Sequence, residues 1–304
     1  MPPKKSPTIR NPEKEKAQLL GDKLARITFH SKKFGQVIIL RPQSSFDMRF
    51  FVYPILICSL LLAFACEQKP TAPDPRLNQP EEFKKLLDAH GDWNKWIKAK
   101  GFSFAMVHET TLEWENHYIS LPDHKVRIDA DLFQMGNDGQ KAWISPNRQA
   151  FSGQSVQFYQ KVYFNLFSIP YLLTDSAVTV KKSENRLVNG QSYETLEANL
   201  SDPKGGPSNH YFLLTDPETG KLAWVLYPIT FFDKETKTLN AVKYEDYRDA
   251  AGLIFPRIMT GYQFENDSTK AFTFQVTFSD IFLVEDELDE ELFEMPKEKA
   301  VVAN

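Results

Sequence analysis

The feature that most constrains the fold is an alternation of apolar and polar residues that begins near Gly101. In residues 125–132, and again in residues 272–278, every second side chain is apolar. A period of two puts successive side chains on opposite faces of a β-strand, and one dry face with one wet face is typical of antiparallel sheet. Turn-forming residues separate such runs at 136–139, 189–190, 216–220 and 265–268. We predict about eleven strands, at residues 102–113, 117–121, 125–134, 140–145, 177–182, 193–200, 210–215, 221–231, 239–248, 253–264 and 271–284.

Two segments have a helical period instead. In residues 81–100, Phe83, Leu86, Leu87 and His90 form one apolar stripe, and Gly91 suits a helix end. This segment is expected to be one bent helix or two short ones. Residues 154–167 place apolar side chains on one helical face, and Pro170 follows.

These patterns predict a mainly β fold with helices, of the α+β class. A sheet of so many twisted strands curls or closes, and two helical segments cover little of it. We therefore expect a strongly bent antiparallel sheet wrapped around the two helical segments. An apolar cavity between them is the default site for a hydrophobic ligand. The alternative is that aromatic side chains, among them the 24 Phe of the chain, fill the space.

Residues 48–66 have the layout of an export signal. Arg49 follows Met48, residues 50–64 are apolar, and small Ala65 precedes Cys66. The apolar run is shorter than the roughly 18–20 residues of a membrane-spanning helix. A cysteine directly after the small residue resembles a bacterial lipoprotein signal, which implies that Cys66 is lipidated and becomes the first residue. The alternatives are a non-lipidated signal peptide and a short membrane anchor.

This signal divides the chain into five parts. Residues 1–47 are expected to be a disordered basic leader upstream of the true start, and residues 48–65 a lipoprotein signal peptide. Residues 66–80 form a proline-rich tether, residues 81–296 one domain, and residues 297–304 a tail.

The net charge argues against nucleic-acid and anionic-lipid partners, and the cysteine content argues against a disulfide in the mature chain. The whole chain carries a net charge of −4, and residues 1–65 hold eleven Lys and Arg against four Asp and Glu, so the remainder stands at −11. Such an acidic domain is not suited to neutralise nucleic-acid phosphates or to be drawn to anionic lipid. The other cysteine, Cys58, lies within the signal, so Cys66 has no partner for a disulfide in the mature chain.

Several turn and aromatic motifs carry a family resemblance. They are Ala89-His90-Gly91-Asp92-Trp93, Ala142-Trp143-Ile144-Ser145-Pro146, the segment from Tyr163 to Leu173, Asp216-Pro217-Glu218-Thr219, Tyr244-Glu245-Asp246-Tyr247, Gly252-Leu253-Ile254-Phe255-Pro256 and Leu292-Phe293-Glu294-Met295-Pro296. Together they resemble an uncharacterised Gram-negative lipoprotein family allied to the LolA/LppX-type outer-membrane lipoprotein-sorting superfamily, over residues 81–296. The resemblance implies an unclosed β-barrel with a helical lid that shelters acyl chains.

The expected function is therefore that of a lipid-anchored, periplasm-facing lipoprotein, attached to the membrane through Cys66 and placed at the outer membrane rather than the inner. It would bind a lipid or lipoprotein acyl chain in the concave face of the half-barrel. The alternative is a ligand-free structural or partner-binding envelope module whose protein partner the sequence does not identify. Trp143, Phe164, Phe167 and Trp224 are the candidate ligand-binding residues, with packing in the core as their alternative role.

An enzyme is the least favoured class. The sequence contains no His-Glu-x-x-His, Gly-x-Ser-x-Gly or Gly-x-Gly-x-x-Gly motif, and we expect no metal and no cofactor. His108, His117 and Asp129 are the best remaining candidates for acid–base chemistry.

Overall fold

A computed structural model of the protein describes residues 79–200, 206–297 and 300–302. All of them lie within the unit Lys69–Asn304. The leader, the signal, Cys66 and nearly all of the proline-rich tether lie outside the described residues. Their expected roles stay predictions.

Among the described residues, three α-helices and three short 3₁₀ turns accompany the sheet. The helices are α2 (Glu81–Ala89), α3 (Asn94–Lys98) and α4 (Val156–Phe167), and the turns are η3 (Arg148–Ala150), η4 (Tyr171–Thr174) and η5 (Glu290–Phe293). Residues 81–100 thus form two short helices, with Gly91 between them at a φ of +96°. Ser155 caps α4, because its hydroxyl accepts a hydrogen bond from the Phe158 N–H at 3.2 Å. Within the described part of the chain, no helix is long and apolar enough to cross a membrane.

One antiparallel sheet of 13 strands makes up most of the molecule, in the order β13-β5-β4-β3-β2-β1-β12-β11-β10-β9-β8-β7-β6. The strands are β1 (Gly101–His108), β2 (Trp114–Ser120), β3 (Val126–Ala130), β4 (Gln134–Asn137), β5 (Ala142–Ser145), β6 (Val178–Val188), β7 (Gln191–Leu200), β8 (His210–Thr215), β9 (Leu222–Pro228), β10 (Leu239–Ala250), β11 (Leu253–Glu265), β12 (Ser268–Val284) and β13 (Val301–Val302). The predicted run 125–134 is two strands, because the Ala130 N–H bonds to the Phe133 carbonyl and closes a turn there.

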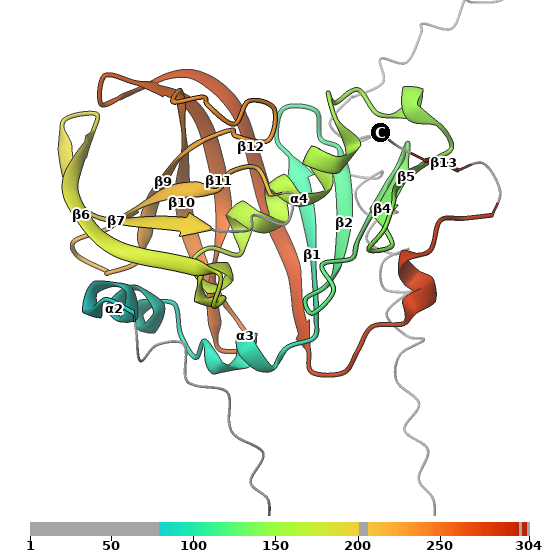
Figure 1. Cartoon of the computed structure of the whole chain (residues 1–304), viewed down its shortest axis with the longest axis horizontal. Helices are drawn as coiled ribbons and strands as arrows, with labels where there is room; N and C mark the ends of the chain where they lie inside the picture. The colour runs from blue at the N-terminus through green and yellow to red at the C-terminus, as the bar shows by residue number, and fades with distance from the viewer. Residues whose placement is uncertain (1–78, 201–205, 298–299, 303–304) are drawn as a thin grey trace, which may run out of the picture. The chain divides into compact units, whose positions relative to one another are not determined.

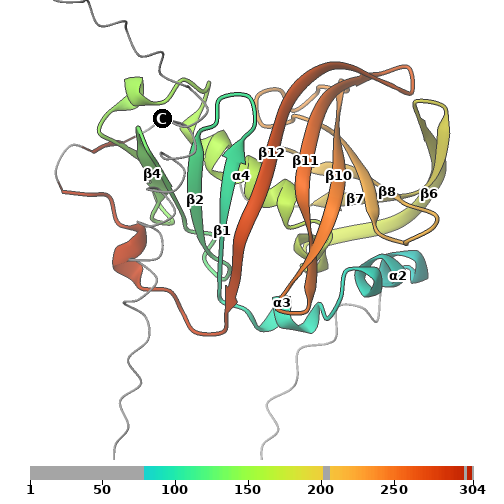
Figure 2. The same cartoon turned by 180° about the vertical axis from the view of Figure 1, so that it is seen from behind.

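The sheet bends until two distant hairpins meet. The Asn189 N–H, at the tip of β6–β7, donates to the Asp267 carbonyl at the tip of β11–β12, at 2.9 Å. The edge strands β6 and β13 do not pair with each other, so the barrel stays unclosed. Helix α4 lies across the concave side of the sheet in Figure 1, and in Figure 2, which is turned by 180°, β12, β11 and β10 lie in front of it. The predicted fold class is confirmed.

Aromatic side chains fill most of the space between α4 and the sheet. Phe167 of α4 stacks on Phe278 of β12 with ring centroids 3.9 Å apart, and also packs on Phe104 and Phe255. A second apolar cluster lies on the other face of the sheet and includes Tyr193, Phe212, Leu214, Trp224 and Leu226. Because side chains alternate between the two faces along each strand, both faces of the sheet carry an apolar cluster. The space that remains open lies in grooves at the surface.

Candidate functional site

A groove with an apolar floor runs beside α4 on the concave side of the sheet. Helix α4 forms one wall, η4 and the start of β6 form another, and β3 and the end of β7 complete it. Its lining residues are His124, Val126, Lys161, Phe164, Asn165, Leu172, Asp175, Ala177, Val178 and Leu200. Five of these are large apolar side chains, and the charged and amide side chains come from α4 and the flanking loops. This combination suits a ligand with an apolar body and a polar end.

The size of the groove decides how a ligand would fit. Counted with the open solvent at its mouth, the groove spans about 530 Å³. The part that holds whole water molecules is only about 40 Å³, where one water needs roughly 10–15 Å³. The groove is therefore shallow, and a deeper site requires its lining side chains to move.

Of the four predicted ligand-binding residues, one lines the groove. Phe164 lines the groove, and Phe167 is fully buried in the aromatic core. Trp224 belongs to the cluster on the opposite face, where its indole N–H donates to the Tyr193 hydroxyl at 3.3 Å. Trp143 is buried elsewhere, and its indole N–H donates to the Phe293 carbonyl of η5 at 3.0 Å. The structure brings together only the two phenylalanines of α4.

A second, polar cavity lies between α2 and the strands β6 to β8. It is lined by Glu82, Lys85, Leu86, Lys182, Glu194, Thr195, Leu196, Thr215, Asp216, Pro217 and Gly220, and it has room for water over about 330 Å³. Lys182 and Glu82 form an ion pair in its lining at 2.8 Å. The lining of this cavity therefore carries charges of both signs.

Behind α4, a carboxylate is buried on the inner face of β2. Glu115 is 1% exposed. Its Oε1 accepts a hydrogen bond from the Tyr159 hydroxyl of α4 at 2.5 Å, and its Oε2 accepts one from His117 Nε2 at 2.9 Å. His108 Nε2 lies 2.8 Å from the same Tyr159 oxygen. We call these four residues the Glu115 network.

Electrostatics keeps Glu115 ionised. Burial by itself would raise the pKa of this carboxyl, but hydrogen bonds from His108, His117 and Tyr159 outweigh burial and lower the pKa to about 2. Burial and the nearby Glu115 charge raise the pKa of Tyr159 well above its usual value. An anion with so low a pKa is a poor general base near neutral pH. The network instead ties α4 to β1 and β2.

The residues considered for catalysis are only partly gathered. His108 and His117 both belong to the Glu115 network, whereas Asp129 pairs with Arg127 at 2.8 Å. On β3, Val126 and Ile128 lie in the inner core, so the alternating Arg127 and Asp129 lie on the outer face. Among the described residues, no group of three or more His, Cys, Asp or Glu side chains is arranged to hold a metal ion.

The sequence analysis missed Glu115 and Tyr159. The available signal was the alternation of β2, which places Glu115 on the same face as His117 and Ile119. A glutamate at an inward-facing position needs a partner. That partner comes from a helix 44 residues away in the sequence.

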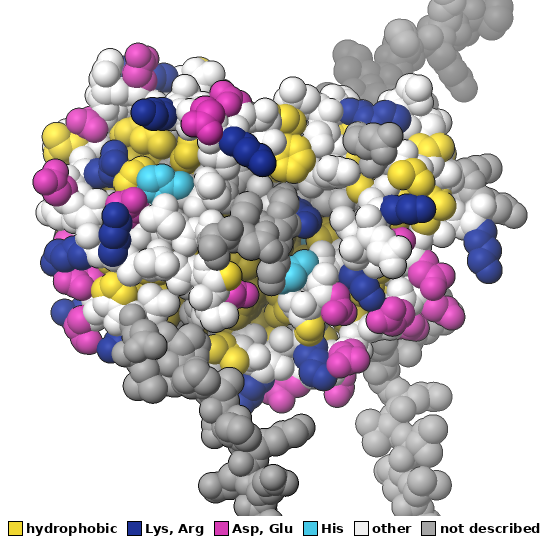
Figure 3. Space-filling view, in the orientation of Figure 1, with side chains coloured by type: hydrophobic (Ala, Val, Ile, Leu, Met, Phe, Trp, Pro, Cys, Tyr) yellow, Lys and Arg dark blue, Asp and Glu magenta, His cyan; other side chains and the backbone are white. Residues whose placement is uncertain are grey.

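Further hydrogen bonds hold α4 along its length. The Gln160 side-chain amide donates to the Gly136 carbonyl at 2.6 Å, and the Tyr244 hydroxyl donates to the Leu166 carbonyl at 2.7 Å. The groove therefore has one firmly held wall. On the face that Figure 3 shows, apolar side chains surface in several separate patches among charged and other polar side chains.

His90 is a packing residue. It is buried, its Nδ1–H donates to the Leu86 carbonyl at 2.8 Å, and its ring meets Tyr171 and Tyr247 edge to face. Burial lowers its pKa to about 4, so the imidazole is neutral near neutral pH.

The sequence matches no protein-family model and no curated protein sequence. Three solved structures are similar to it at low sequence identity. A LolA superfamily protein from Nitrosomonas europaea has 9% identity and a TM-score of 0.44, covering 70% of this chain and 96% of that one. A putative outer membrane lipoprotein-sorting protein domain from Vibrio parahaemolyticus has 10% identity and a TM-score of 0.42, and the match covers 69% of this chain and 97% of that one.

The third structure is a DUF1329 family protein from Desulfovibrio piger, with 10% identity and a TM-score of 0.43. The match covers 74% of this chain and 98% of that one.

Proposed function

We propose that this protein binds one lipid-like molecule in the groove beside α4. The apolar chain of the ligand lies against Phe164, Val126 and Val178, and its polar end lies at the rim, where α4 and the loop after η4 supply Lys161 and Asp175. The observation that supports this proposal is an apolar floor with a polar rim on the concave side of an unclosed sheet. An acyl group of a lipid or of a lipoprotein has this chemistry.

Binding of a whole acyl chain requires the groove to deepen. The volume that the groove offers to water, about 40 Å³, is far smaller than the several hundred Å³ of established ligand pockets. Leu172 and Leu200 are only partly buried at the groove, so their displacement exposes little new apolar surface. Helix α4 keeps its place, because the Glu115 network holds its other side.

The test is saturable binding of a fluorescent fatty acid to the purified chain. Leu172→Gln should weaken binding by about tenfold or more, since a polar group on the floor loses roughly 1.4 kcal/mol or more of apolar contact. The matched control is Leu132→Gln, because Leu132 is exposed at 68% in the turn between β3 and β4 and lines neither cavity. Equal affinities of the two variants would remove the groove as the binding site.

We also propose that the mature protein is attached to the bacterial envelope by a lipid on Cys66, with the domain facing the periplasm or the cell surface. The signal in residues 48–66 supports this proposal. Mass spectrometry of the intact chain should show the added acyl mass, and Cys66→Ser should abolish it. An anchoring lipid is covalent and survives denaturing solvent extraction, whereas a ligand of the groove is removed, so the two lipids are distinguished in one sample.

A further inference from the structure

The two edges of the sheet are protected in different ways. The β6 edge carries Lys181, Lys182, Glu184 and Arg186 along its length, and its register with β7 shifts between Ser183 and Arg186. Charged side chains and bulges are common devices against unwanted strand pairing. The charged side chains and the bulge of β6 thus protect this edge from pairing with another strand.

The β5 edge has no such protection. Its four residues, Ala142-Trp143-Ile144-Ser145, include no charged side chain. What covers them is β13, in the register Val301 opposite Ile144 and Val302 opposite Trp143. The side chains of both valines remain largely exposed, at 41% and 51%. Main-chain pairing, and not burial, therefore holds β13 on this edge.

On its other side, β5 pairs with β4 over all four residues, from Gln134 opposite Ser145 to Asn137 opposite Ala142. Among the described residues of the C-terminal segment, Val301 and Val302 pair with Ile144 and Trp143.

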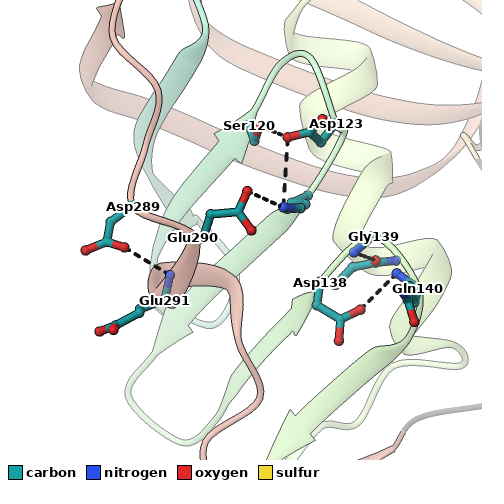
Figure 4. Close-up of polar contacts among 10 residues, drawn as sticks. Ser120, Asp123, Asp138, Gly139, Gln140, Asp289, Glu290 and Glu291 are labelled. Atoms are coloured by element: carbon teal, nitrogen blue, oxygen red, sulfur yellow. Dashed lines mark hydrogen bonds and ion pairs between the residues drawn. The ribbon is translucent and has the colours of Figure 1, made fainter.

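The C-terminal segment is held independently just before it reaches this edge. In η5, Phe293 is buried and its carbonyl accepts from the Trp143 indole, while the Leu292 carbonyl accepts from Arg127 at 3.1 Å. The Asp289 carboxylate accepts a hydrogen bond from the Glu291 N–H at 3.1 Å, and Glu290 pairs with Lys125 at 3.0 Å. Figure 4 shows Asp289, Glu290 and Glu291 beside the strands. Release of β13 therefore uncovers β5 and leaves these contacts in place.

We propose that the β5 edge is a strand-addition site for an extended, uncharged peptide segment of a partner protein, and that β13 occupies it as an internal competitor. In strand addition, main-chain hydrogen bonds supply affinity and alternate side chains supply selectivity. The segment that the edge selects contains consecutive β-branched residues, as β13 does, because they lie opposite Ile144 and Trp143 on the two faces. The site is separate from the groove beside α4.

The test uses the full chain and a chain that ends at residue 299. The probe is a fluorescent synthetic peptide with the sequence of residues 294–304, Glu-Met-Pro-Lys-Glu-Lys-Ala-Val-Val-Ala-Asn. The shortened chain should bind it saturably, and the full chain about tenfold or more weakly, because a tethered competitor acts at an effective concentration on the order of millimolar. A peptide with both valines replaced by proline should lose binding, since proline donates no hydrogen bond.

A second variant tests the same proposal in case the shortened chain does not fold. Val301→Pro with Val302→Pro keeps the full length and should also open the edge to the peptide. Amide hydrogen exchange at Trp143 and Ile144 should then quicken in both variants and slow again when the peptide is added. Equal binding by full and shortened chains, undiminished binding of the proline peptide, or no binding up to millimolar concentration would overturn the proposal. Dimerisation of the shortened chain through β5 would assign the edge to a second copy instead.

Discussion

The two sides of α4 differ in how they meet the rest of the molecule. On one side, Tyr159 donates to the buried Glu115 carboxylate, and Phe167 stacks on Phe278 in the aromatic core. On the other side, Phe164 and Leu172 border a groove that still has space for water. One side is closely packed and hydrogen-bonded, and the other is apolar and open.

This difference shows how a small helical cover can serve both stability and binding. Interiors with densely packed rings resist rearrangement, so the Phe167 side fixes where α4 lies. Beside Phe164 the groove leaves space for water, and ligand-dependent changes tend to use the less stable parts of a structure. We therefore expect mutations behind α4 to affect stability first, and mutations in the groove to affect binding first.

The largest effect is expected from Glu115→Ala. The substitution leaves His117, His108 and Tyr159 without the anion that they surround, and removal of one partner from a buried charged group typically costs about 3–5 kcal/mol. Denaturant unfolding of the purified chain measures the change. A loss below about 1 kcal/mol would show that α4 does not depend on this network.

The pH dependence of stability should reveal His90 and Glu115 as separate steps. The folded pKa of His90, about 4, lies below its ordinary value of 6.5, so its contribution is complete above pH 6.5 and is lost as the pH falls toward 4. The folded pKa of Glu115, about 2, lies below 4.5, so its contribution is lost between pH 4.5 and about 2. Each step amounts to about 3 kcal/mol.

Unfolding free energies measured from pH 7 down to pH 2.5 test this assignment. Glu115→Gln should flatten the lower step and retain the step between pH 6.5 and 4. A variant that lost both steps, or neither, would contradict the separate roles of the two residues.

A smaller effect is expected from Tyr159→Phe. The substitution keeps the ring, which packs against Phe151 and Tyr163, and removes one hydrogen bond to a charged acceptor, a loss of about 1–3 kcal/mol. Calorimetric unfolding should detect it. Fatty-acid affinity should change less than it does in Leu172→Gln, and the reverse order would place the ligand on the Tyr159 side of the helix.

The smallest effect on binding is expected from Trp224→Phe. Trp224 was a candidate from the sequence, but its side chain belongs to the cluster on the opposite face of the sheet. Fatty-acid affinity should therefore remain within about twofold of the unchanged chain, a difference below 0.5 kcal/mol. A tenfold loss in a folded variant would move the site to that face.

Much of the fold could be predicted because its signals are local. The alternation along β12 marks a strand, and Asn189-Gly190 supplies the two positive φ values, 52° and 84°, that a tight hairpin needs. The division of residues 125–134 was missed because its turn contains no glycine or proline. The two-residue β13 carries no alternation at all and is defined only by its pairing with β5.

The site was less predictable because it depends on contacts between distant segments. The register of β1 and β2 places Glu115 opposite Met106, close to His108, and α4 then adds Tyr159. The groove likewise joins β3, α4, η4, β6 and β7. Its aromatic character was foreseen through Phe164, but no local pattern separates a groove-lining Phe164 from a core-filling Phe167 three positions later.

The central claim, that a lipid-like molecule lies in the groove beside α4, is tested most directly by locating a bound fatty acid. A fatty acid with a nitroxide near its methyl end should broaden the NMR signals of Val126, Phe164 and Val178 in the purified chain, and an excess of unlabelled fatty acid should restore them. Signals of Leu214 and Leu226, on the opposite face, should stay sharp. Broadening confined to that opposite face, or no saturable broadening anywhere, would contradict the account.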